Sequence, residues 1–220
     1  MAPADLTLDE LRAALAPLVA ANAAFDGWSD RAVIAAAEQF GADPDVARLA
    51  FKGGAVEMID AWFAEVDTRM IAAVPADRLA AMKIRQRITA LVEARLDAVS
   101  GDREALRRAL TILAMPQNVA RAAKLAWRTV DLIWRLAGDT ATDYNHYTKR
   151  AMLVAVYGTT VTVFLDDESG GHVDTRAFLA RRIDGIMAFE RLKHQFLSSR
   201  DPERRLSLSR FVGRLRYPAV

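Results

Sequence analysis

Few residues of this 220-residue chain have the types and the spacing that catalysis requires. The chain has no cysteine, which excludes a thiolate zinc site, an iron–sulfur cluster and a cysteine nucleophile. Its three histidines, His146, His172 and His194, have neither the i, i+4 nor the Glu-x-x-His spacing of metal-binding helices. Ser169 and Thr160 have no base placed near them beyond His172 in a loop. We therefore expect no catalytic residue, no metal and no cofactor.

The densest group of polar and aromatic residues lies at 125–171. Trp127, Val130 and Trp134 recur at i, i+3 and i+7, which places both indoles on one helix face with Asp131 beside them. An ordinary core stripe is the alternative interpretation of this face. Polar and aromatic residues also crowd the start of the next helix, namely Asp143, Tyr144, Asn145, His146, Tyr147, Lys149 and Arg150. Such mixtures are typical of protein interfaces, so we expect a partner surface here.

Beyond Arg150 the same helix is apolar on nearly every side. The residues that make it so are Met152, Leu153, Val156, Tyr157, Thr160, Val161, Phe164 and Leu165. Such a helix is either central to a core or lines an apolar cavity, and the sequence leaves both possibilities open. Tyrosine and threonine hydroxyls are suited to the polar end of a lipid pocket. The uncharged run at 151–165 is shorter than the roughly 20 residues of a membrane span.

Apolar residues at helical spacing, with prolines at helix starts, predict an all-α fold. We expect helices at 7–20, 29–40, 44–50, 53–71, 76–99, 102–113, 117–137, 143–165, 173–197 and 202–216. Strand-like alternation and internal repeats are not found. The predicted organisation is an N-terminal module (24–72), a larger helical domain for lipid binding and dimerisation (73–198) and a tail (199–220).

Residues 27–63 resemble the three-helix N-terminal module of TetR regulators, with a helix-turn-helix-like pattern. Ser29 is the expected N-cap of the first of these helices, and Gly41 its stop. Residues 1–70, however, contain five basic against twelve acidic residues, a net charge of −7. The short helix begins with Asp43, Pro44 and Asp45, and acids at that position repel DNA. A structural module is therefore expected, with DNA binding as the minor alternative.

The two ends of the chain carry opposite charge. Residues 191–220 contain eight basic against two acidic residues, a net charge of +6. The tail forms a basic amphipathic pattern whose expected membrane contacts are Arg205, Leu208, Arg210, Phe211, Val212, Arg214 and Leu215. This pattern favours binding to a membrane surface, and a helix that docks on the bundle is the alternative. The acidic N-terminus lacks the features of a secretory signal or a transit peptide, which predicts a cytoplasmic protein.

A long patterned run resembles the coenzyme Q nine family of ubiquinone-biosynthesis accessory proteins. It reads Trp134-x-x-Ala137-Gly138-Asp139-x-x-Thr142-Asp143-Tyr144-Asn145-x-Tyr147-Thr148-Lys149-Arg150-Ala151, followed by Asp166-x-x-Ser169 and Asp174-Thr175-x-x-Phe178-Leu179-x-x-Arg182-Ile183. The resemblance covers about residues 24 to 195. Two positions depart from the family pattern: His146 and Arg176 stand where tryptophan is usual. Loss of an aromatic anchor costs about 2 kcal/mol at an interface.

The resemblance implies a TetR-like homodimer that has lost DNA binding and does no chemistry of its own. It implies a pocket for an isoprenoid or quinone lipid, with expected contacts from Trp127, Met152, Leu153, Val156, Tyr157, Thr160, Val161 and Phe164. It also implies a partner, the di-iron demethoxyubiquinone hydroxylase, bound through Asp131, Ile133, Asp143, His146, Tyr147 and Arg150. The expected location is the cytoplasm, with peripheral association at the inner membrane. The alternatives are a ligand-responsive transcriptional regulator of the TetR type and an enzyme on a helical bundle.

Overall fold

The computed structural model describes residues 5–140 and 144–198 of the chain. Within these ranges the secondary structure is entirely helical, and no strand is present. Residues 1–180 form one compact unit and residues 181–220 form a second one, and the last described helix passes from the first into the second. The prediction of an all-α fold is confirmed.

Ten α-helices lie in the described residues. They are α1 (Leu8–Asp26), α2 (Asp30–Phe40), α3 (Pro44–Ala50), α4 (Ala55–Ala73), α5 (Ala76–Ala80), α6 (Ile84–Asp97), α7 (Arg103–Leu113), α8 (Val119–Leu136), α9 (Tyr144–Asp166) and α10 (Val173–Ser198). Short 3-10 turns precede three of them: η2 (Ser100–Asp102), η3 (Pro116–Asn118) and η4 (Gly170–His172). None of the helices described is long and apolar enough to cross a membrane. The helix expected at 202–216 lies outside the described residues.

The prediction of one helix over 76–99 was wrong. The chain breaks after α5, and Lys83 takes an extended backbone (φ −72°, ψ 153°) before α6 begins. The side chain of Arg87 stabilises the break, because its Nε donates to the carbonyl of Met82 (2.9 Å) and its Nη1 to that of Ala137 (2.9 Å). No glycine or proline marks this corner, so local sequence patterns did not reveal it. Similarly, α1 continues to Asp26 rather than ending near residue 20.

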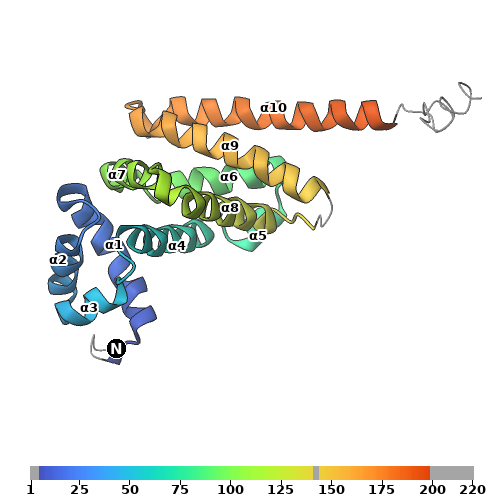
Figure 1. Cartoon of the computed structure of the whole chain (residues 1–220). Coiled ribbons are helices and arrows are strands. Elements are labelled where there is room, and N and C mark those ends of the chain that lie inside the picture. The colour runs from blue at the N-terminus through green and yellow to red at the C-terminus, as the bar shows by residue number, and fades with distance from the viewer. Residues whose placement is uncertain (1–4, 141–143, 199–220) are drawn as a thin grey trace, which may run out of the picture. The chain divides into compact units, whose positions relative to one another are not determined.

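α1, α2 and α3 pack on one another and form a helix-turn-helix-like module at the N-terminal end of the first unit (Figure 1), which includes α1, a helix that the predicted bounds of 24–72 left out. The Asp43 carboxylate accepts from the backbone N–H groups of Asp45 (2.7 Å) and Val46 (3.3 Å) and so caps α3. Trp28 ties the module to the rest of the unit. Its ring lies 5.3 Å from that of Trp62 on α4, and its Nε1 donates to the Ala105 carbonyl on α7 (3.1 Å).

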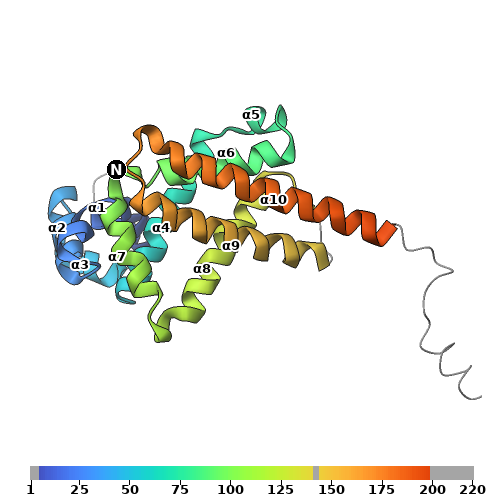
Figure 2. The same ribbon diagram turned by 90° about the horizontal axis from the view of Figure 1, so that it is seen from above.

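The predicted partner and lipid residues lie on the remaining helices of the first unit. α6 packs against α4, α8 and α9, while α8 and α9 contact each other and cross rather than run side by side (Figure 2). α7 contacts α1, α4 and α8. The α8–α9 pair therefore lies beside a core formed by α4 and α6, which places the predicted partner block and the predicted lipid helix on adjacent elements.

Candidate functional site

A buried arginine holds the start of α9 against the end of α8. Arg150 is 1% exposed. Its Nε donates to Oδ1 of Asp131 (2.7 Å), and its Nη1 donates to Oδ2 of Asp139 (3.1 Å) and to the His146 carbonyl (3.1 Å). Lys149 Nζ donates to the other Asp139 oxygen (2.9 Å). Hydrogen bonds to charged partners on several sides are what a buried guanidinium requires, so we name this the Arg150 network.

Aromatic side chains cover the Arg150 network. The rings of Trp127 and Tyr147 stack with centroids 6.1 Å apart, and His146 meets Tyr147 edge-on at 5.1 Å. Tyr147 is 62% exposed, while Trp127 and His146 are half-buried. Trp134 is buried, and its Nε1 donates to the Lys149 carbonyl (3.3 Å). One indole of the predicted pair thus lies at the surface and the other belongs to the core.

Some of the residues predicted to contact a partner reach the surface, and others are buried. Asp131, His146 and Tyr147 are half-buried or exposed, so their side chains reach the surface. Ile133, which is 0% exposed, and Arg150 lie beneath it. Contact of these residues with a partner stays a prediction, in which Ile133 and Arg150 would support the surface from beneath. Asp143 lies outside the described residues.

The predicted lipid helix, α9, has two distinct faces. Its buried residues are Arg150, Leu153, Val156, Thr160, Val161 and Phe164. Met152 and Tyr157 are half-buried. Between Arg150 and Phe164 the exposed positions hold small residues, namely Ala151, Ala155, Gly158, Thr159 and Thr162. Phe164 lines a void of about 10 Å³ and meets the His172 ring at 4.8 Å. Most of the predicted lipid contacts therefore pack in the core, and their contact with a lipid stays a prediction.

A second buried arginine was not predicted. Arg95 on α6 is 2% exposed and lies between the rings of Phe63 and Tyr157, with its Cζ 5.3 and 5.6 Å from their centroids. Its Nη2 donates to the hydroxyl of Thr129 (3.2 Å), and its Nε lies 3.3 Å from Oδ1 of Asp67. We call these five side chains the Arg95 cluster. It brings together α4, α6, α8 and α9.

The Arg95 cluster is incompletely satisfied. Arg95 Nε and Asp67 Oδ1 are both buried, and neither has a hydrogen-bond partner within the described residues, although they attract each other as charges. Burial raises the pKa of Asp67 against the lowering effect of Arg95, and burial also raises the pKa of Tyr157. A signal was available in the sequence: Arg95 continues the apolar stripe of Ile88, Leu91 and Val92 at helical spacing.

Comparison with known proteins shows what these elements are similar to. Residues 119–190, which span α8, α9 and the start of α10, match the COQ9 family model. The resemblance to the COQ9 family is thereby confirmed. The chain is 33% identical over 168 residues to the mitochondrial ubiquinone biosynthesis protein COQ9 of Homo sapiens, covering 73% of this chain and 52% of that protein. It is 26% identical over 192 residues to the COQ9 protein of Drosophila melanogaster, covering 86% of this chain and 59% of that one.

The chain thus spans between half and three fifths of the length of these two COQ9 relatives. Among solved structures, it resembles the crystal structure of the TetR transcriptional regulator from Nitrosomonas europaea, with a TM-score of 0.64 and 25% sequence identity. That match covers 79% of this chain and 96% of the regulator. The predicted TetR-like fold is confirmed.

One part of the COQ9-like pattern forms a helix cap. Oδ1 of Asp167 accepts from the N–H (2.8 Å) and hydroxyl (2.5 Å) of Ser169, and Oδ2 accepts from the N–H (2.9 Å) and hydroxyl (2.5 Å) of Thr175. These hydrogen bonds hold the pKa of Asp167 well below its usual range. Ser169 and Thr175 therefore join the end of α9 to the first turns of α10.

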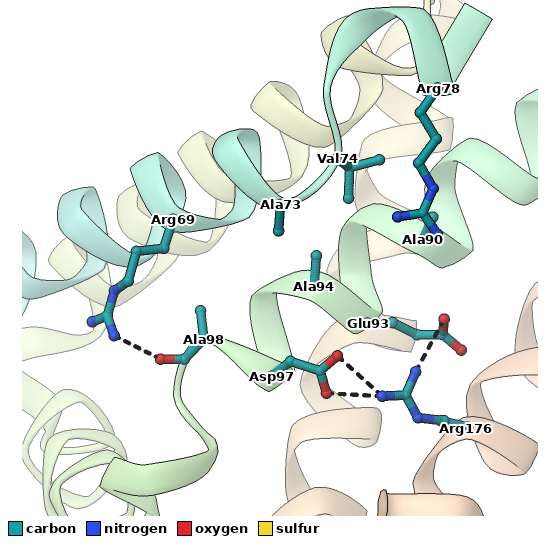
Figure 3. Close-up of a pocket in the computed structure, with 10 residues that line it drawn as sticks. All are labelled: Arg69, Ala73, Val74, Arg78, Ala90, Glu93, Ala94, Asp97, Ala98 and Arg176. Carbon is teal, nitrogen blue, oxygen red and sulfur yellow. Dashed lines mark hydrogen bonds and ion pairs between the residues drawn. The ribbon is translucent and has the colours of Figure 1, made fainter. Parts of the chain in front are cut away.

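Two cavities of the first unit are lined by none of the predicted lipid residues. One, of about 330 Å³, has a floor of small apolar residues and a rim of Arg69, Arg78, Glu93, Asp97 and Arg176 (Figure 3). Arg176 pairs with Glu93 (3.2 Å) and with both Asp97 oxygens (2.9 and 3.0 Å). The other, of about 360 Å³, lies between α4 and α8. Among the described residues, no group of three or more potential metal ligands is found.

Proposed function

We propose that this chain is a non-catalytic accessory protein of ubiquinone biosynthesis that binds an isoprenoid quinone intermediate. The observation that carries the proposal is the COQ9 match at 119–190, which falls on α8 and α9. Those helices hold the Arg150 network, its aromatic cover and the apolar face of α9. The relatives are themselves named ubiquinone biosynthesis proteins.

In this proposal the α8–α9 surface presents the bound lipid to the di-iron demethoxyubiquinone hydroxylase. Tyr147, with Trp127 and His146 beside it, is the exposed aromatic centre of that surface. Exposed aromatic side chains that are supported by well-packed residues beneath them are typical of interface hot spots. His146→Trp, which restores the indole usual in the family, is expected to strengthen capture of the hydroxylase in a pulldown, and unchanged capture would show that the position is not a contact.

The proposal includes a homodimer and peripheral attachment to the inner membrane. The exposed small residues of α9 allow another helix to approach closely, which is compatible with docking of a second copy. The basic amphipathic tail, 199–220, is the proposed membrane contact. A protein truncated after residue 198 is expected to lose binding to anionic liposomes and to keep its helical circular dichroism spectrum. Sedimentation with the liposomes equal to that of the full chain would contradict the role of the tail.

The direct test is mass spectrometry of organic extracts from the purified protein, with the truncated form as control for membrane carry-over. A stoichiometric isoprenoid or quinone lipid in both forms is the expected result. Lipid in the full chain alone would mean that the tail carries membrane lipid, and no lipid in either form would contradict the proposal.

The TetR-like fold favours one other candidate, a DNA-binding regulator, since the solved neighbour is a transcriptional regulator. The chemistry of α3 argues against it. Asp43 caps the helix, Arg48 is paired with Asp45 (3.1 Å), and Val46 and Leu49 are exposed. Fluorescence anisotropy with mixed-sequence duplex DNA is expected to show no binding, whereas tight, sequence-dependent binding would favour the regulator.

A further inference from the structure

We propose that the cavity between α4 and α8 binds a phosphate monoester. α8 contributes Arg121, Lys124 and Arg128 to the lining of this cavity of about 360 Å³, and α4 contributes Glu57 and Asp60. We call it the α4–α8 cavity. Its volume suits a small molecule or the head group of a larger one. None of the residues expected to contact lipid lines it, so the inference goes beyond the proposed function.

The three basic residues of the α4–α8 cavity share one face of α8. Their spacing is i, i+3 and i+7, which brings like charges close together and is unfavourable without a counter-charge. Leu125 lies on the same face and is buried, so this face packs toward the rest of the first unit. Residues 105–130 contain five basic residues and no acidic one. The counter-charge must therefore come from outside this segment or from a ligand.

The two acidic residues of the cavity already have partners. Asp60 forms an ion pair with Arg128. Oε2 of Glu57 accepts from the backbone N–H of Gly53 (2.7 Å), and Oε1 of Glu57 lies 3.6 Å from Nη2 of Arg12. The acidic side chains of α4 are therefore engaged with groups other than the first two basic residues of α8.

Arg121 and Lys124 are the unpaired cations of the α4–α8 cavity. Both side chains are exposed, and neither makes a hydrogen bond or an ion pair within the described residues. Because Arg128 is held by Asp60, the cavity keeps two positive charges available for a ligand. An anionic ligand would be attracted to these charges and would remove the repulsion between them.

A phosphate monoester matches the two free cations in charge and in hydrogen bonding. It carries about 1.5 to 2 negative charges at neutral pH and three oxygens that accept hydrogen bonds. Arginine binds such oxygens with a fork of N–H groups, and lysine binds them as a compact charge. A carboxylate carries one charge and would leave the second cation without a partner. Val56 and Leu125, which line the same cavity, offer apolar contact to the carbon atoms of the ester.

Two probes present this group from different sources. Glycerol 3-phosphate is a soluble ester, and phosphatidylcholine vesicles that contain phosphatidic acid present the same group at a lipid surface. Vesicles that contain oleate in place of phosphatidic acid present carboxylates instead. Binding to the full chain is measured by isothermal titration calorimetry for the soluble ester and by cosedimentation for the vesicles.

Arg121→Gln combined with Lys124→Gln removes both free cations and is expected to lower the affinity for a phosphate probe about tenfold. Arg31→Gln combined with Arg135→Gln is the matched control, because it removes the same charge from exposed positions that do not line the cavity. The control should leave the affinity within about twofold. A loss on vesicles alone identifies a lipid head group as the source, and a loss on glycerol 3-phosphate identifies a soluble ester. The tail is the same in both variants, so its attraction to the vesicles cancels.

Thermal unfolding shows whether the variant is folded. Because Arg121 and Lys124 repel each other without a partner, their replacement should leave the unfolding midpoint equal to that of the natural chain or raise it. A lower midpoint would show that the chain itself uses these side chains for stability, and would overturn the assignment.

Three other results would overturn the proposal. Equal losses in the two double variants would show a general attraction between charges and no site. A loss on oleate vesicles as large as that on phosphatidic acid vesicles would contradict the preference for phosphate. Binding of both phosphate probes that is absent, or that Arg121→Gln with Lys124→Gln leaves unchanged, would contradict the site itself. The lipid-binding role proposed for α9 would stand in each case, because its residues do not line the α4–α8 cavity.

Discussion

Arg150 and Arg95 are both buried in the first unit, and each lies beside a carboxylate, yet their surroundings differ. Arg150 donates to two carboxylates and a carbonyl, and Lys149 and Arg135 share those carboxylates. Arg95 donates to one hydroxyl, lies between two aromatic rings, and faces Asp67 without a hydrogen bond. The hydrogen bonds of the Arg150 network are made within the chain, whereas the Arg95 cluster keeps buried atoms without a hydrogen bond.

This difference indicates two kinds of role. A buried charge that has all its hydrogen-bond partners favours one conformation, because any other conformation leaves the charge buried without partners. A buried charge with unused donors is a less stable arrangement that a ligand is able to complete. Arg150 is therefore interpreted as the residue that sets the α8–α9 geometry, and Arg95 as a buried charge whose hydrogen bonding is incomplete. The following measurements sharpen or break this contrast, from the largest expected effect to the smallest.

Removal of Arg150 should have the largest effect. Arg150→Met removes one of the two cations paired with Asp139, whose side chain is 6% exposed, and leaves Lys149 as the other, which is expected to lower the free energy of unfolding by about 3 kcal/mol. Chemical denaturation followed by circular dichroism measures this. Arg135→Met is the control, because Arg135 also pairs with Asp131 (3.0 Å) but is exposed, and its loss should cost less than about 1 kcal/mol. Equal losses in the two variants would break the contrast.

Removal of the Thr129 hydroxyl should have an intermediate effect. Thr129→Val preserves shape and takes away the acceptor for Arg95 Nη2, which leaves a further buried donor unpaired. A loss of about 1–3 kcal/mol in the free energy of unfolding is expected in the absence of ligand. Thr162→Val, at an exposed position of α9, is the control. A stability equal to that of the natural chain would mean that Nη2 has another partner.

Replacement of the whole Arg95 pair should cost little. Arg95→Met combined with Asp67→Leu removes both buried charges and fills the space with apolar atoms, so the free energy of unfolding should stay the same or rise. A large loss of stability would show instead that the Arg95 cluster is as structural as the Arg150 network.

A pH comparison should give the smallest effect. Burial raises the pKa of Asp67 in the folded chain above its ordinary 3.8, so the folded state takes up a proton before the unfolded state does. Acidification through that pKa should thus shift the stability difference between the natural chain and Asp67→Asn in favour of the natural chain. Denaturation at pH 7 and pH 4.5 measures the shift, and a shift of opposite sign would mean that pairing with Arg95 outweighs burial.

The sequence predicted most of the fold because its signals are local. Pro44 at the first helical position, with Asp43 as the N-cap, marks the start of α3, and the predicted helix at 44–50 has the same bounds as α3. The corner between α5 and α6 was missed because Arg87, which stabilises it, binds carbonyls as distant as that of Ala137. Nothing near Arg87 in the chain marks that contact.

Prediction of the site was weaker because its residues act through distant partners. Arg150 was predicted to touch a partner, since an arginine among tyrosines and histidine resembles an interface. Its burial depends on Asp131 and Asp139, which reach it only when α8 and α9 pack. Arg95 carried the opposite signal, a charge within an apolar stripe, and was overlooked because such positions are usually solvated.

The ion pairs of Arg176 make the contact between α6 and the first turns of α10 sensitive to electrolytes. The side chains of Arg176, Glu93 and Asp97 all remain partly exposed, so dissolved ions compete with their attraction. An indole at this position would hold the same helices by apolar contact, which added ions do not weaken. This chain therefore joins α10 to α6 by a contact whose strength depends on ionic strength.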